Sequence, residues 1–61
     1  MENFRLKFIL AALKKCDENK SQLTDWEKNF IADITWLVKN RISLKTHQYN
    51  KLMDIKEKII N

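Results

Sequence analysis

Few side chains in this sequence could perform acid–base or nucleophilic chemistry, and those few are isolated. His47 is the only histidine and Cys16 the only cysteine, and nothing in their spacing places the two together. Asp33 and Asp54 are single carboxylates on separate predicted helices, with no spacing suited to a metal ion. Catalysis needs a nucleophile or an acid–base pair in a shielded pocket, so we expect no enzyme activity, no metal and no cofactor.

The single cysteine indicates the cellular environment in which we expect the protein to be found. Cys16 cannot form an internal disulfide, and at its predicted position near the end of a helix it is expected to be buried and inert. The longest apolar run, residues 8–13, is far shorter than the roughly 18 residues that suggest a membrane span. An unpaired cysteine fits a reducing environment, and we therefore expect a complete cytoplasmic protein with no membrane partner.

Basic side chains give the stronger chemical signal. The formal net charge is +4, which permits nucleic acid as a partner. The basic excess lies in residues 1–20 and 41–61, because residues 21–40 are slightly acidic. The residues predicted to contact phosphates are Arg41, Lys45, His47, Lys51 and Lys58. A solvated helix face without a ligand is the alternative reading of the same lysines.

These side chains must be positioned by helices, because Gly and Pro are both absent and hairpin turns lack their preferred residues. The spacing of apolar residues predicts an all-α fold, a compact three-helix arrangement with helices at about 2–16, 25–39 and 44–59. The chain is long enough for one domain only, residues 1–61. In the first helix the expected core stripe is Leu6, Ile9, Leu10 and Leu13.

Capping signals support the second and third helices. Thr24 and Glu27 have the spacing of a capping box at the start of the second helix, and Ser43 is the expected N-cap of the third. The expected apolar face of the second helix is Trp26, Phe30, Ile31, Ile34, Leu37 and Val38. The expected stripe of the third is Tyr49, Leu52, Ile55 and Ile59, widened by Met53 and Ile60.

The chain carries more apolar helix surface than this arrangement needs. Phe4, Phe8 and Ala11 fall on the side of the first helix opposite Leu6 and Leu10, and Trp36 points away from the core face of the second. Either the ends of the bundle fold over these residues or another molecule covers them. A chain this short buries only about 60% of its unfolded surface, so a homodimer is the simplest way to cover them.

The runs LTDWEKNFIADI and RISLKTHQYNKLMDI resemble a short helical module of phage and bacterial DNA-processing accessory proteins. The resemblance covers residues 23–59. The matching positions are Leu23, Thr24, Trp26, Glu27, Phe30, Ser43, Leu44, Gln48 and Leu52. It implies an accessory role in DNA metabolism or in conflict between phage and host.

Two main hypotheses follow from the sequence, beside the possibility of a purely structural helical subunit of a larger assembly. The first is a non-enzymatic, phage-like protein that binds nucleic acid through phosphate contacts. The second is a protein-binding adaptor or inhibitor of host defence that acts through the aromatic residues left outside the core.

Overall fold

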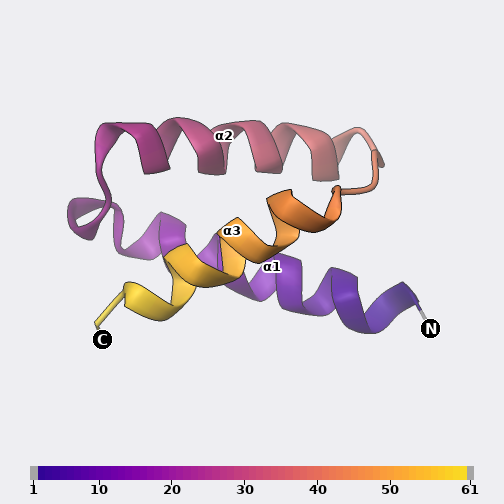
Figure 1. Ribbon diagram of the computed structural model, residues 1–61, viewed down its shortest axis with the longest axis horizontal. Coiled ribbons are helices and arrows are strands. Elements are labelled where there is room, and N and C mark those ends of the chain that lie inside the picture. The colour runs from indigo at the N-terminus through magenta and orange to yellow at the C-terminus, as the bar shows by residue number, and fades with distance from the viewer. Residues whose placement is uncertain (1, 61) are drawn as a thin grey trace.

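The computed structural model describes the backbone of residues 2–60 and the side chains of residues 5–60. Within these residues the fold is all-helical, as predicted, and consists of α1 (Glu2–Glu18), a short 3-10 turn η1 (Lys20–Gln22), α2 (Asp25–Lys39) and α3 (Thr46–Lys58). α1 and α2 run antiparallel, and α3 crosses α1 on its way back along the molecule (Figure 1). α1 therefore ends two residues later than predicted, and α3 begins two residues later and ends one earlier.

A small apolar core lies where the three helices meet. Its fully buried side chains are contributed by all three helices, and they are Ala12, Cys16, Ile34, Leu52 and Ile55. Leu23 before α2 and Ile59 after α3 are also buried and close the core at one end. Most of the expected stripes of α2 and α3 are confirmed, although Ile60 is exposed.

The predicted core stripe of α1 is partly wrong. Ile9 and Leu13 are buried, but Leu6 and Leu10 are 44% and 48% exposed. The buried face of α1 is instead centred on Ala12 and Cys16, because α3 packs closely against the side of α1 that carries these small residues. Trp26 of α2 is likewise exposed and stacks on Phe30 at the margin of the core, with ring centroids 5.4 Å apart.

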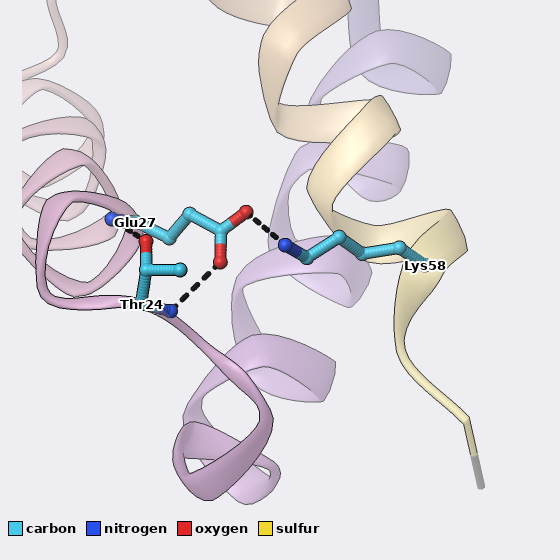
Figure 2. Close-up of polar contacts among 3 residues, drawn as sticks. All are labelled: Thr24, Glu27 and Lys58. Atoms are coloured by element: carbon cyan, nitrogen blue, oxygen red, sulfur yellow. Dashed lines mark hydrogen bonds and ion pairs between the residues drawn. The ribbon is translucent and has the colours of Figure 1, made fainter.

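The start of α2 is tied to the end of α3 through one carboxylate (Figure 2). The predicted capping box is confirmed: the Thr24 N–H donates to Glu27 Oε1 at 2.8 Å, and the Glu27 N–H donates to Thr24 Oγ1 at 3.1 Å. The other carboxylate oxygen of Glu27 forms an ion pair with the Lys58 ammonium, and Glu27 is itself buried. The Lys58 ammonium and the Thr24 N–H together lower the pKa of the Glu27 carboxyl.

A second link holds the segment after α3 against the loop before α2. The Gln22 amide donates to the Ile60 carbonyl at 2.7 Å, and the Ile60 N–H donates back to Gln22 Oε1 at 2.8 Å. These two hydrogen bonds keep Ile59 directed into the core while leaving Ile60 exposed. Both polar links lie at the end of the bundle opposite the α2–α3 connection (Figure 1).

Candidate functional site

The connection between α2 and α3 begins with a backbone conformation that ordinarily calls for glycine. The Arg41 N–H donates to the Val38 carbonyl and the Ile42 N–H donates to the Leu37 carbonyl, which is the hydrogen-bond pattern of a Schellman motif. Arg41 occupies its left-handed position with φ of 58°. A side chain with a Cβ is disfavoured there by about 1–2 kcal/mol relative to the right-handed region. The fold alone would prefer Gly or Asn at this residue.

The start of α3 breaks a second local rule. The N-cap is Lys45, and the predicted Ser43 cap is wrong because α3 begins only at Thr46. The Lys45 ammonium cannot accept a hydrogen bond from the first turn, and that turn contains no acidic residue. Only the reciprocal half of the cap exists: the Lys45 N–H donates to Gln48 Oε1 at 2.9 Å. A cation at the positive end of a helix dipole is also unfavourable.

These two cations belong to a segment with an unusual charge distribution. Residues 34–53 contain four Lys and Arg residues and no Asp or Glu, whereas the remaining residues contain eight basic and eight acidic ones. The whole net charge of +4 therefore lies in this segment. We call residues 39–47 the basic junction; its charged side chains, Lys39, Arg41 and Lys45, are all exposed. None of the three forms an ion pair with a carboxylate among the side chains of residues 5–60.

The structure divides the predicted phosphate-binding residues into two groups. Arg41, Lys45 and His47 are exposed in or beside the connection that follows α2. Lys51 and Lys58 instead face the start of α2: the Lys51 ammonium lies 5.2 Å from the centroid of the Trp26 ring, and that of Lys58 pairs with Glu27. At 1.5 Å per residue, the two ends of α2 are about 20 Å apart. Lys58 is already neutralised by Glu27, so the basic junction is the more suitable anion site.

The predicted partner interface is also divided. The Phe4 side chain lies outside the described residues. Phe8 is exposed on α1, and Ala11 is exposed beside it. Trp36 is equally exposed but lies on α2, two residues after the fully buried Ile34. Because two residues correspond to a rotation of about 200° around a helix, Trp36 faces away from the core, on a different helix from Phe8.

A shallow groove runs between α1 and α2, with a volume of about 380 Å³ and an open side. The apolar residues that line it are Leu10, Leu13, Ile31 and Val38, and the polar ones at its rim are Lys14, Asp17, Thr35 and Lys39. The exposed Leu10 therefore stands beside a depression and not on a flat helix face.

The candidates for chemistry are not brought together. Cys16 is fully buried in α1, as predicted, and desolvation raises the pKa of its thiol, with a smaller contribution from Glu27. His47 is exposed in the first turn of α3. Among the described residues, no group of three His, Cys, Asp or Glu side chains lies close enough to hold a metal ion.

Two further cations, one within the basic junction and one on α1, are not among the phosphate contacts predicted from the sequence. Lys39 is the cation within the basic junction. Arg5 was not considered, yet its guanidinium lies 4.3 Å from the centroid of the Tyr49 ring of α3. The contact brings the N-terminal part of α1 to the first turns of α3. Only the packing of α1 on α3 reveals it, because Arg5 and Tyr49 are far apart in the chain.

No protein-family model matches the chain, and no curated protein or solved structure is significantly similar to it. The resemblance of residues 23–59 to a phage and bacterial module therefore stays a prediction. None of the helices among residues 2–60 has the length and apolar character that crossing a membrane requires.

Proposed function

We propose that this chain is a small non-enzymatic protein that binds nucleic acid through the phosphate backbone, with the basic junction as its contact surface. The observation that carries the proposal is the charge distribution, in which residues 34–53 hold the entire net charge and no carboxylate. Phosphate contacts need cations whose charge is not already neutralised within the protein. An accessory role in phage or bacterial DNA metabolism rests on the sequence resemblance alone, and a cytoplasmic location is supported by the single cysteine, Cys16, which has no internal disulfide partner.

The local conformation supports the same surface. Arg41 stands where glycine would stabilise the turn, and Lys45 stands where an oxygen-bearing side chain would cap α3. Places where a sequence departs from local structural preference are commonly places where function constrains it. The N–H groups of Thr46, His47 and Gln48, in the first turn of α3, receive no side-chain cap and add donors that suit a phosphate oxygen.

A salt titration tests the proposal. Three phosphate contacts, from Lys39, Arg41 and Lys45, predict a slope of log K against log salt of about −2 for a single strand and about −2.7 for a duplex. Affinity should then fall roughly 20-fold to 40-fold between about 50 and 200 mM salt, measured by anisotropy of a labelled oligonucleotide. Absence of binding at low salt, or binding that ignores salt, would contradict the proposal.

A pair of matched variants tests whether binding depends on the basic junction or only on the net charge of the chain. The double substitution Arg41→Gln with Lys45→Gln should weaken binding strongly and make the salt slope shallower. The control double substitution, Lys20→Gln with Lys28→Gln, removes the same charge from exposed positions outside residues 34–53. Equal loss of affinity in both proteins would show that binding follows net charge and not the basic junction.

A second candidate function is association with protein, either another copy of this chain or a different partner, through α1. It is supported by exposed apolar side chains on two sides of this helix: Phe8 on one side, and Leu6 and Leu10 on the other, where the groove lies beside Leu10. Replacement of Phe8 by Ser should convert a dimer to a monomer in analytical ultracentrifugation without lowering the melting temperature. A wild-type chain that is monomeric at high concentration and captures no partner would remove this candidate.

A further inference from the structure

Trp36 lies outside the apolar core and is not among the residues packed against it. It is 57% exposed and lies on the outward face of α2, opposite Ile34. No described aromatic ring stacks on it and no described cation lies over it, unlike Trp26, which is equally exposed but contacts both the Phe30 ring and the Lys51 ammonium. The backbone carbonyl of Trp36 accepts hydrogen bonds from the Asn40 N–H and side-chain amide at 3.0 and 2.8 Å. These hydrogen bonds cap the end of α2, while the indole of Trp36 remains more than half exposed to solvent.

The position of this indole within the charge distribution is informative. Asp33, one turn before Trp36, is the last carboxylate before the segment that carries the net charge. Lys39 follows Trp36 by three residues, which makes the two side chains neighbours on the helix surface. Arg41 and the exposed Ile42 follow directly at the turn. An aromatic face is thus placed at the edge of a strongly cationic surface.

Phosphate binding does not require an exposed indole, but an indole can stack on an unpaired base. A base of any identity stacks on an aromatic side chain, and proteins that bind single strands combine such stacking with a basic track for the backbone. The bases of a duplex are already stacked on one another and cannot use the indole without being pulled out of the helix. We propose that the basic junction takes single-stranded nucleic acid, with Trp36 stacking on a base while Lys39, Arg41 and Lys45 neutralise the adjacent phosphates.

The proposal rests on the proposed function and adds to it the class of nucleic acid. Under this proposal Trp36 distinguishes single-stranded from double-stranded nucleic acid, because the cations bind the phosphates of both equally. Loss of the indole should lower the affinity for a single strand by about 5-fold to 150-fold, the range typical of one stacked base. The affinity for a duplex and the salt slopes should stay as they are in the wild type.

The experiment compares the wild type with Trp36→Ala on labelled oligothymidine and on a duplex of the same length, by anisotropy at low salt. Trp26→Ala is the matched control, because this tryptophan is equally exposed but lies at the other end of α2. We expect Trp36→Ala to lose single-strand affinity selectively and Trp26→Ala to keep it. Circular dichroism checks that both variants remain helical.

A second measurement needs no alanine at Trp36. In the Trp26→Phe protein Trp36 is the only tryptophan, and stacking should quench its fluorescence on addition of oligothymidine and not on addition of duplex. Binding without quenching, or a Trp36→Ala protein that binds oligothymidine as the wild type does, would overturn this inference and leave the proposed function standing. Failure of the wild type to bind either oligonucleotide would overturn both. A dimer that Trp36→Ala dissociates would place the indole at a protein interface instead.

Discussion

Replacing Arg41 by glycine should make the protein more stable and a weaker binder at the same time. The left-handed conformation of residue 41, with φ of 58°, disfavours a non-glycine residue by about 1–2 kcal/mol. Glycine removes that penalty but adds roughly 0.5–1 kcal/mol of backbone entropy to the unfolded chain. The difference predicts a gain of about 0.5–1 kcal/mol in the free energy of unfolding, or roughly 2–8 °C in melting temperature.

The same substitution removes one of the three exposed cations of the basic junction. The slope of log K against log salt for a single strand should become shallower by about 0.7, which corresponds to a roughly eightfold loss of affinity at about 50 mM salt. Thermal melts followed by circular dichroism and anisotropy titrations measure the two effects on one preparation. Arg41→Lys, which keeps the charge and the conformational penalty, should change neither quantity much. A glycine variant that melts at a lower temperature, or one that binds as tightly as the wild type, would refute the reasoning.

Three further substitutions or conditions test other parts of the structure. Lys45→Ser should raise the free energy of unfolding by about 0.5–1 kcal/mol, because a hydroxyl caps α3, and should weaken oligonucleotide binding; a cap that brings no stability would show that α3 begins elsewhere. The pKa of Glu27 is lowered in the folded chain. Its carboxylate therefore stabilises the fold at pH values above the ordinary glutamate pKa of about 4.3, and this stabilisation is lost as the pH falls through the lower pKa of the folded state. The free energy of unfolding should therefore fall less steeply with acid in Glu27→Gln, which keeps an acceptor for the cap but loses the ion pair with Lys58. Identical acid transitions in the variant and the wild type would contradict the assignment. Finally, Cys16 should react with a thiol reagent at pH 8 only as fast as the chain unfolds, and labelling as rapid as in denaturant would mean that α1 does not bury it.

The reading of the helices from sequence succeeded where a signal is local. Thr24 and Glu27 define the start of α2 because a capping box needs only residues three apart, and the structure has that cap. The period of the apolar residues gave three helices and the buried faces of α2 and α3. It failed for α1, where apolar residues occur on several sides, and only the packing of α3 on the small side chains of Ala12 and Cys16 selected the buried face.

The basic surface shows the same division. Composition and charge along the chain pointed to cations around α3, but the sequence could not say which of them were already engaged. The sequence predicts Lys58 as a phosphate contact, and the structure shows that its ammonium is already paired with Glu27, 31 positions earlier in the chain. Arg5 was overlooked, and its guanidinium lies over Tyr49. Contacts between residues distant in the chain have no periodic signature and follow only from how the helices pack.

The sequence by itself determined that this chain is helical, where α2 begins, and that the net charge is positive, because propensity, capping and composition act over a few neighbouring residues. Tertiary structure alone decided that Leu6, Leu10 and Trp26 are exposed and that Lys51 and Lys58 face the start of α2. It also set the left-handed turn at Arg41 and the position of the α3 N-cap. The exposures and the lysine positions depend on how the three helices pack together, and no short stretch of residues specifies that packing.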